Sequence, residues 1–466
     1  MKKLIALLLA VVMVLGLVAC ASSAKTEEPA KTEEPAKTEE PTAEEPTAEE
    51  PATEEPAAAA TGSVYYLNFK PEADEAWQKL AETYTNLTGV PVKVVTAASG
   101  DYSTTLNAQM GKAGAPTLFQ VGNAQGLVDW DDYCLDLSGT ALAGELTTND
   151  FNLYNDNGEL KALGYCFETY GIITNKALLA EAGYSVDDIT DFASLKAVAD
   201  DIHARADELG FDAFTSAGLD GSSSWRFSGH LTNMPLFYEF RDDGVTTQPE
   251  TVTGAYLDNF RNIWDLYIND ACVPVSDLPT ATGDQAEAEF GEGKAVFYQN
   301  GTWEYASLVT DEAKGFLMNP DDITMIPIYC GVDGEENSGL CSGTENCWAV
   351  NSQSSEEDIQ ATLDFLYWVV TSEEGTTMMV DQFGSVPFKS APESSNVFIA
   401  DGNKMLADGK YAVTWAFLST PNVDSWRAGI VTALAAYSAD QTDANWEGVV
   451  TAFVDGWAIE YAMQNG

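Results

Sequence analysis

Basic residues and histidine are scarce in this chain. Its 466 residues include 22 lysines and arginines and two histidines, against 73 aspartates and glutamates, which gives a formal net charge of −51. So acidic a surface disfavours nucleic acid and anionic membrane surfaces as partners. Salt adaptation would produce the same balance, and the charge says little about a neutral solute.

Sequence signals of cofactors, metals and catalysis are missing as well. There is no Cys-x-x-Cys pair, no P-loop, and no Gly-x-Gly-x-x-Gly that opens a helix after a strand. Residues 339–343 (Gly-Leu-Cys-Ser-Gly) imitate a nucleophile elbow, but the α/β-hydrolase order requires a histidine after the nucleophile. His203 and His230 both precede it. We therefore expect no metal, no cofactor and no enzyme activity, and we interpret His230 as structural.

Long apolar runs are confined to the N-terminus. Two lysines precede an apolar stretch of 15 residues, Leu4 to Val18. As a helix this stretch measures about 22 Å, less than the ~30 Å hydrocarbon core of a bilayer, so it predicts a secretory signal. Cys20 directly follows Leu-Val-Ala, which resembles a bacterial lipobox. Residues 1–19 are thus interpreted as a lipoprotein signal peptide and Cys20 as the lipidated N-terminus; an ordinary signal cleaved near Ala21 is the alternative.

Residues 20–60 are predicted to form a disordered tether. Positions 25–56 repeat Lys-Thr-Glu-Glu-Pro-Ala and its variants, with twelve glutamates, three lysines and no aromatic or branched aliphatic residue. Such a segment cannot bury apolar surface, and its frequent prolines exclude a helical spacer.

Six cysteines follow Cys20 in the sequence: Cys134, Cys166, Cys272, Cys330, Cys341 and Cys347. An exported protein can oxidise such residues, and Cys341 could pair with Cys347 or Cys330. Spacing alone leaves the connectivity open.

Residues 61–466 are too many for one hydrophobic core and fit two lobes. They open with strand-like runs that alternate with helical patterns, in the order 64–69, 72–87, 92–95, 102–110 and 117–121. This alternation predicts a parallel sheet with right-handed crossovers. Further helical patterns occur at 191–209, 257–268, 284–290, 356–370, 425–437 and 446–463.

Position along the chain suggests several ligand contacts. Ligands of open sheets lie beyond the carboxyl ends of the strands, which points to Lys70 and Glu72 after the first strand and Asn123 after the third. Further contacts are suggested by Gln299 and Asn300 at another strand end, and by Trp225 and Arg226 after a polar loop. Gln299 and Asn300 could instead cap a turn, and Arg226 could hold an acidic residue of the domain.

A series of segments occurs in a distinctive order: 87–92 (Leu-Thr-Gly-Val-Pro-Val), 115–121 (Ala-Pro-Thr-Leu-Phe-Gln-Val), 165–176, 290–296 (Phe-Gly-Glu-Gly-Lys-Ala-Val) running on to Gly-Thr-Trp at 301–303, and 348–350. By this order, nearly all of 61–466 resembles the extracellular solute-binding proteins of carbohydrate ABC importers, which include maltodextrin-binding proteins. No single motif decides the resemblance.

The resemblance implies an α/β, two-lobed periplasmic-binding-protein-like (type II) fold with an interlobe cleft and a hinge. The chain would cross to the second lobe near 164–174 and return near 323–329, and the C-terminal helices would pack across both lobes. The approximate bounds are 61–164 and 324–400 for lobe 1, and 165–323 and 401–466 for lobe 2.

The resemblance also implies site residues. A sugar needs flat rings for its apolar face and planar polar groups for its hydroxyls. Trp303 stands where the family places a stacking tryptophan, and Glu168 matches an acid that accepts hydrogen bonds from sugar hydroxyls. Tyr102, Glu345 and Trp426 match ligand-facing segments more loosely. Packing for Trp303 and a surface position for Glu168 are the alternatives.

The predicted function is capture of a mono- or oligosaccharide between the lobes and its delivery to ABC transporter permease subunits. Only a solute that touches both lobes would stabilise the closed form. The protein would be a monomer, held by the lipid on Cys20 at the outer face of the cytoplasmic membrane, on the cell surface or in the periplasm. Alternatives are a binding lipoprotein for a peptide or polyamine, and a sensor subunit. An extracellular glycoside hydrolase comes last, because carboxylate pairs arise by chance in so acidic a chain.

Overall fold

The computed structural model describes residues 62–98, 101–149 and 151–465. The expected signal peptide, the Cys20 lipidation site and the tether lie outside the described residues. Within the described ranges, no helix combines the length and the apolar character needed to span a membrane.

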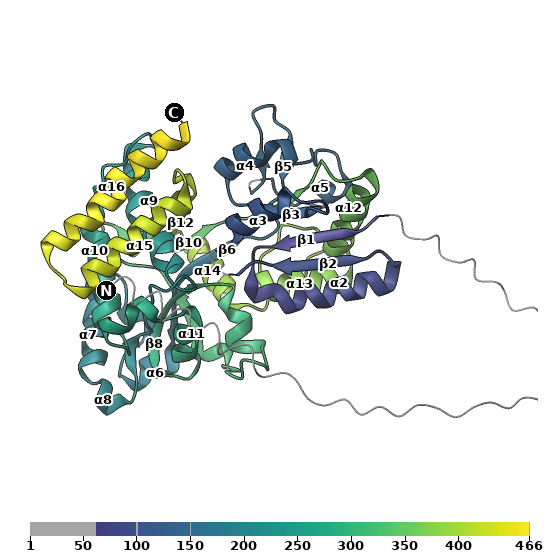
Figure 1. The fold of residues 1–466 in the computed structure, drawn as a ribbon. Helices are drawn as coiled ribbons and strands as arrows, with labels where there is room; N and C mark the ends of the chain where they lie inside the picture. The colour runs from purple at the N-terminus through teal and green to yellow at the C-terminus, as the bar shows by residue number, and fades with distance from the viewer. Residues whose placement is uncertain (1–61, 99–100, 150, 466) are drawn as a thin grey trace, which may run out of the picture. The chain divides into compact units, whose positions relative to one another are not determined.

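The first sheet has four strands in the order β11-β3-β1-β2 (Figure 1). β1 (Val64–Asn68) pairs in parallel with β2 (Val92–Thr96) and with β3 (Leu118–Val121). β11 (Cys347–Val350) returns from far along the chain and runs antiparallel to β3. The parallel arrangement of the first three strands confirms the prediction from the alternating pattern.

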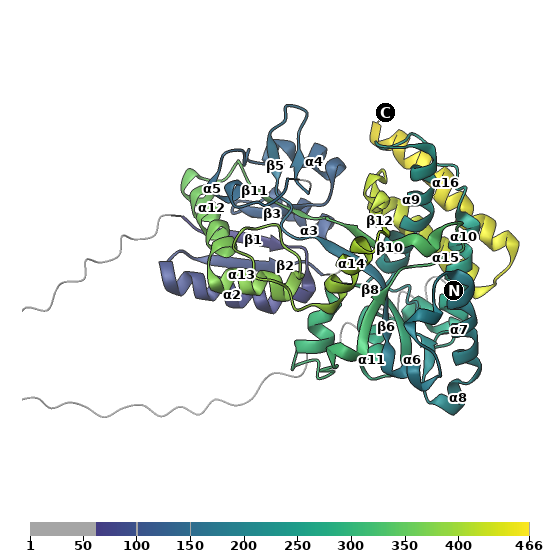
Figure 2. The same ribbon diagram turned by 180° about the vertical axis from the view of Figure 1, so that it is seen from behind.

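Both faces of this sheet are covered, because consecutive strand residues point to opposite sides. Tyr66 packs with one buried cluster and Leu67 with another. The Tyr66 face carries α2 (Asp74–Thr88), α5 (Ala141–Gly144), α12 (Glu356–Thr371) and α13 (Glu373–Phe383); α2 and α13 lie side by side (Figure 2). The Leu67 face carries α3 (Tyr102–Met110) and α4 (Ala124–Trp130), and β4 (Leu153–Tyr154) and β5 (Leu160–Ala162) form a separate hairpin.

The second sheet has six strands. Its main path is β12-β10-β6-β8-β7, and β9 also pairs with β6. The long central strand β6 is buried along its whole length, and it runs antiparallel to β8, β9 and β10. The strand bounds are Glu168–Asn175 for β6, Asp212–Phe214 for β7, Ala295–Gly301 for β8, Ile323–Ile326 for β9, Ser338–Gly343 for β10 and Tyr411–Thr414 for β12.

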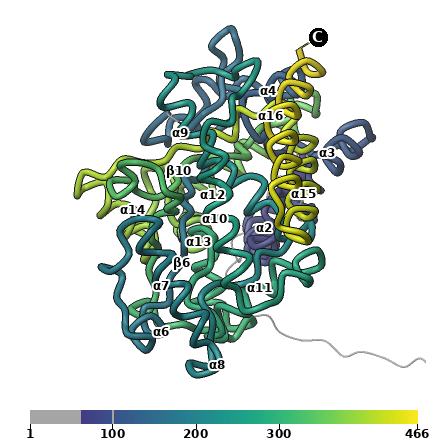
Figure 3. The backbone as a smooth tube through the Cα atoms, turned by 90° about the vertical axis from the view of Figure 1, so that its left-hand side faces the viewer, coloured from purple at the N-terminus to yellow at the C-terminus, as the bar shows by residue number. Residues whose placement is uncertain are grey.

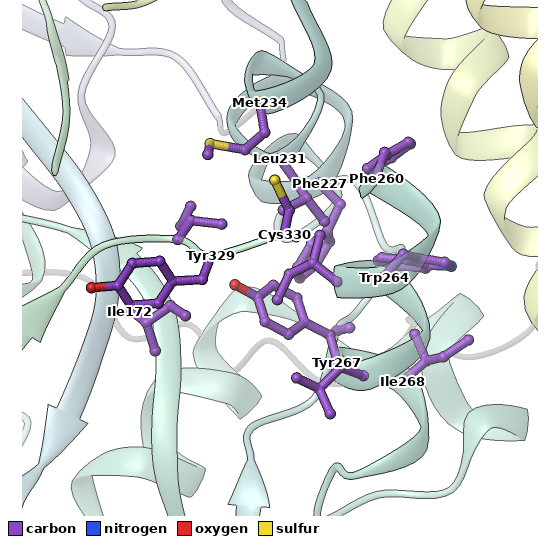
Figure 4. Packing of buried hydrophobic residues seen from close by; sticks show 14 of the residues in the cluster. Ile172, Phe227, Leu231, Met234, Phe260, Trp264, Tyr267, Ile268, Tyr329 and Cys330 are labelled. Carbon is purple, nitrogen blue, oxygen red and sulfur yellow. The ribbon is translucent and has the colours of Figure 1, made fainter. Parts of the chain in front are cut away.

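Helices enclose this second sheet and share its core. They are α6 (Lys176–Glu181), α7 (Phe192–Ala204), α8 (Ala206–Leu209), α9 (Asn233–Asp243), α10 (Leu257–Asn269), α11 (Gly283–Gly291), α14 (Val397–Ala407), α15 (Val423–Ala439) and α16 (Asp443–Asn465), with π-helical segments at Arg226–Leu231 and Ala306–Thr310. α15 and α16 lie side by side (Figure 3). Figure 4 shows Trp264 and Tyr267 of α10 among the buried side chains, with Phe227 and Leu231 of the π-helical segment.

The chain passes between the two sheets three times. It leaves the first between β5 and β6, as expected, but it does not return near 323–329, because β9 and β10 both pair with β6. The return lies between Gly343 and Cys347. A third passage separates α13 from α14, which contacts β6, β9, β10 and β12. The C-terminal helices also differ from expectation, since their buried residues belong to the core of the second sheet.

Candidate ligand site

Lys70 and Glu72 follow β1, where the strand-end rule placed them. The Asn68 side chain holds this turn, because its amide donates to Lys70 O at 2.7 Å and its oxygen accepts from Lys70 N at 3.1 Å. Lys70 Nζ lies 2.7 Å from Glu168 Oε1, at the start of β6, and 3.9 Å from Glu72 Oε1. The Lys70–Glu168 ion pair therefore joins the first sheet to the second.

Burial distinguishes the three members of this charged group. The Lys70 and Glu168 side chains are 5% and 2% exposed, whereas that of Glu72 is 32% exposed. Burial alone would lower the pKa of Lys70, but the Glu168 and Glu72 carboxylates outweigh it and raise that pKa, so Lys70 is charged. Burial raises the pKa of Glu72 against the opposing effect of Lys70. Glu72 is thus the member that a solute can reach.

Trp225 and Trp303 lie close together beside the end of β8. Their ring centroids are 6.0 Å apart at an interplanar angle of 53°, and both side chains are partly exposed. The Trp303 ring covers Gly301 so closely that a Cβ there would lie 2.2–2.6 Å from three ring carbons. The Trp225 indole N–H donates to Ser222 O at 2.8 Å. Both rings are therefore held in place with part of their surface free.

His230 and Arg427 border the tryptophan pair. The His230 ring centroid lies 5.0 Å from that of Trp225 and 5.4 Å from that of Trp303, and the imidazole stacks on Tyr170 at 4.0 Å. Burial lowers the pKa of His230 well below its usual value, and the charge of Arg427 lowers it further, so the imidazole is neutral. Arg427 Nη2 lies 3.4 Å from Trp225 O, and its side chain is partly exposed.

Glu345 lies in the segment that returns from β10 to β11, and it is partly exposed. Burial raises its pKa, while the positive charges of Lys70 and Arg427 partly oppose that effect. Glu345 therefore interacts with one cation that follows β1 and with another on α15. Glu345 is therefore within electrostatic range both of Lys70, which pairs with Glu168, and of Arg427, which lies beside Trp225.

The bodies built on the two sheets also contact each other directly. Asn123 caps α4 by accepting from Gly126 N at 2.8 Å, and its amide donates to Leu418 O at 3.1 Å. Ser103 Oγ on α3 donates to Asp424 Oδ2 on α15 at 2.8 Å. Asn123, expected from the strand-end rule, thus lies at the junction between the two bodies.

Several other expected contacts are buried and bonded within the protein. The Tyr102 hydroxyl donates to Leu67 O and accepts from Gln120 N. Asn300 is 1% exposed, and its amide donates to Tyr298 Oη and Glu304 Oε1. The polar groups of these two side chains are therefore already bonded within the protein.

Arg226 and Gln299 are buried as well. Arg226 is 1% exposed, and its guanidinium donates to Gln299 O, Ser216 O and Ser223 Oγ at 3.2, 3.1 and 2.7 Å. The alternative to a ligand contact was that Arg226 holds an acidic residue, but no ion pair of the described residues includes Arg226. Gln299 is 2% exposed.

Trp426 lies in the core between α15 and α16. It is 2% exposed, donates to Phe453 O at 3.0 Å, and packs edge-on against Trp457 at 6.0 Å. A solute cannot reach this ring, which corrects the expected contact at Trp426, whereas the next residue, Arg427, is partly exposed. The difference between the two residues reflects helix geometry, in which neighbours point about 100° apart.

Neither of the two possible cysteine pairs, Cys341 with Cys347 or Cys341 with Cys330, forms a disulfide. All six described cysteines are free. Cys341 lies in β10 of the second sheet and Cys347 in β11 of the first, and Cys341 Sγ contacts Met234 Sδ at 3.6 Å. Among the described residues, no group of three or more histidine, cysteine, aspartate or glutamate side chains is placed to hold a metal ion.

The junction thus combines two partly exposed indole rings with carboxyl, guanidinium and amide groups. Residues 79–407 match the model of the bacterial extracellular solute-binding protein family. The chain belongs to that family. No curated protein matches this solute-binding protein significantly in sequence.

Solved structures confirm the two-lobed α/β fold of this solute-binding protein. The chain is similar to RafE in complex with raffinose, with a TM-score of 0.66 and 16% identity over 85% of this chain and 100% of that one; RafE is also solved in its apo form from Streptococcus pneumoniae. The GacH receptor of Streptomyces glaucescens, solved unliganded and with acarbose, gives 0.62 and 20% over 86% and 99%. The solute receptor AcbH, whose substrate preference is β-D-galactopyranose, gives 0.67 and 13% over 86% and 100%.

Sequence reasoning missed Arg427, Glu304 and the position of His230. Arg427 is one of few arginines in an acidic chain, and this scarcity could have singled it out. The stacking of His230 on Tyr170 agrees with a structural role for this histidine. The His230 ring also contacts the rings of Trp225 and Trp303, which the sequence did not indicate. Glu304 follows Trp303 directly and gave no separate signal.

Proposed function

We propose that this solute-binding protein captures a mono- or oligosaccharide at the junction of its two lobes and delivers it to the permease of an ABC importer. The observation that carries the proposal is the partly exposed Trp225–Trp303 pair, in electrostatic range of accessible carboxyl and guanidinium groups. Sugar ligands in the structures of RafE and GacH, which share the fold, support the same class of cargo.

In this proposal each accessible side chain has a defined role. The C–H face of a sugar ring stacks on Trp303, and Trp225 closes the side of the platform. Glu72 and Glu345 accept hydrogen bonds from hydroxyls, and Arg427 donates to them. The buried Lys70–Glu168 pair sets the position of Glu72.

Closure of the lobes supplies the selectivity. Glu72 and Asn123 belong to the lobe of the first sheet, whereas the tryptophans and Arg427 belong to the lobe of the second. A solute that contacts both sets shifts the population towards the closed form, which is the form that the permease reads. A solute that contacts only one set does not.

Thermal-shift screening against mono- and oligosaccharides tests the cargo. A ligand at about 100 times its dissociation constant adds about 2.7 kcal/mol of stability, so a cognate saccharide raises the Tm measurably. Trp303→Ala abolishes this rise. Trp368→Ala is the matched control, since Trp368 is another partly buried tryptophan, and it packs on Tyr84 and Phe365 in the first lobe. A peptide or polyamine that raises the Tm where no saccharide does would overturn the cargo.

The proposal includes a lipid anchor on Cys20, which would hold the protein at the outer face of the cytoplasmic membrane. Cys20→Ala then abolishes incorporation of labelled fatty acid and releases the protein from the membrane fraction.

The protein is proposed to bind without catalysis, so a saccharide incubated with it is recovered unchanged. Cleavage of that saccharide by the purified protein would instead indicate the glycoside hydrolase alternative.

A further inference from the structure

A small internal cavity lies within the lobe of the second sheet. Five polar residues line it: Thr215, and with it Ser216, Arg226, Tyr267 and Gln299. The last four come from the segment after β7, the π-helical segment, α10 and β8. Figure 4 shows Tyr267 reaching from α10 into the interior near Phe227, which also lines the cavity.

These four side chains are almost completely enclosed. Their exposures are 0% for Ser216, 1% for Arg226 and Tyr267, and 2% for Gln299. Even so, five of their polar atoms have no hydrogen-bond partner among the described protein atoms: Ser216 Oγ, Arg226 Nε, Tyr267 Oη, and both Nε2 and Oε1 of Gln299. Buried polar atoms in folded proteins are nearly always bonded, so five such atoms around one cavity point to a bound partner.

The chemistry of the five atoms selects that partner. Arg226 Nε and Gln299 Nε2 only donate, Gln299 Oε1 only accepts, and the two hydroxyls do both. A partner that both donates and accepts can therefore bond to one or more atoms of all four residues, as water does with up to four hydrogen bonds and an anion does not. The cavity leaves about 10 Å³ for the centre of a water-sized sphere, which is close to what one water needs.

The surroundings argue in the same direction. Glu289 Oε2 accepts from Ser216 N at 2.7 Å, which places a carboxylate next to the cavity wall and disfavours an anion inside. The Arg226 guanidinium is already bonded to two carbonyls and a hydroxyl through Nη1 and Nη2, so Nε is its one nitrogen without any acceptor among the described residues.

We propose that this cavity is a structural water site, in which an ordered water bridges Arg226 Nε, the Gln299 amide and the hydroxyls of Ser216 and Tyr267. The bridged residues immediately adjoin the proposed platform, because Arg226 follows Trp225 and Gln299 lies four positions before Trp303. The water thereby fixes the π-helical segment and β8 relative to α10. This site exists whether or not the cargo is a saccharide.

A crystal structure of the full chain at high resolution tests the site directly. We expect a density peak within about 2.7–3.2 Å of Gln299 and Arg226 Nε. An empty cavity overturns the proposal. An anomalous peak at this position after bromide soaking would identify a halide and overturn it as well.

The change in Tm caused by Tyr267→Phe tests the same site, because its sign depends on whether a water is bound. If the hydroxyl is bonded to water, its removal lowers the Tm by about 2 °C. If the cavity is dry, removal of an unbonded buried hydroxyl leaves the Tm unchanged or raises it, which contradicts the proposal. Tyr170→Phe is the control, because Tyr170 is fully buried with its hydroxyl donating to His230 O at 3.1 Å, and its removal lowers the Tm in either case.

Discussion

Lys70 and Glu168 form a buried ion pair, with Nζ 2.7 Å from Oε1, between the turn after β1 and the first residue of β6. The two residues are far apart in the sequence, and Lys70 follows a strand of the first sheet whereas Glu168 belongs to the second. The pair therefore holds the start of the first crossing segment against the end of a strand in the first lobe. Burial raises the pKa values of Glu72 and Glu345 nearby, and the positive charge of Lys70 partly opposes that effect.

Removal of one partner of this pair should be costly. Lys70→Met leaves the Glu168 carboxylate buried without its cation, and we expect the free energy of unfolding to fall by about 3–5 kcal/mol. The double variant Lys70→Met/Glu168→Leu removes both charges and should recover most of that loss. Equilibrium unfolding in urea measures both values.

The exposed pair Lys404–Asp408 provides the control. Its side chains are 75% and 56% exposed, so Lys404→Met should cost less than about 0.5 kcal/mol. Equal losses for Lys70→Met and Lys404→Met would show that the buried pair is not formed in solution.

Gly301 provides a test of the Trp303 platform that keeps the tryptophan itself. A Cβ at this position would lie 2.2–2.6 Å from the indole ring, so Gly301→Ala must displace the ring. We expect this variant to lose the saccharide-induced rise in Tm at ligand concentrations that saturate the wild type. Gly429→Ala is the control, because a Cβ at that position would have no neighbouring atom within 4 Å. A full ligand response in Gly301→Ala would mean that the orientation of Trp303 does not matter for binding.

Glu304 gives the protein a pH dependence of predictable sign. Burial, and secondarily the Glu287 carboxylate, raise the pKa of Glu304 from 4.5 to about 8. The folded state therefore binds this proton more tightly than the unfolded chain does. Protonation of Glu304 therefore stabilises the folded state fully below about pH 4.5, and this stabilisation is lost as the pH rises through about 8.

Glu304→Gln removes this titration while retaining an oxygen that can accept from Asn300. The Tm of the variant relative to the wild type should therefore increase as the pH is raised from about 5 to about 8. Thermal scans across that range measure the difference. A difference that stays constant or decreases with pH would show that Glu304 is ionised throughout.

Much of the first lobe could be predicted because its pattern is local. The strands and helices from 64 to 121 alternate clearly, and α3 begins and ends where the helical spacing indicated. The strand-end rule predicted ligand contacts at Lys70, Glu72 and Asn123; the structure places these residues directly after β1 and β3.

The parts that sequence reasoning missed depend on tertiary packing. Residues 233–240 of α9 are all buried, so this helix has no polar face to produce a period. α14 contains Asp401-Gly402-Asn403, which reads as a turn but lies within a helix packed on the second sheet. Trp426 is buried and Arg427 is partly exposed because α15 packs against α16 through the face that carries Trp426. The local sequence does not show which face of α15 packs in this way. The point at which the chain returns to the first lobe depends on which strands pair with β6, and the sequence does not show that pairing.

A crystal structure with the saccharide that raises the Tm most would show whether this protein holds a sugar between its two lobes. We predict that the sugar lies at the junction, with one ring face against Trp303 and hydroxyls within hydrogen-bond distance of Glu72 from the first lobe and Arg427 from the second. A sugar bound elsewhere, or held by one lobe alone, would contradict this prediction.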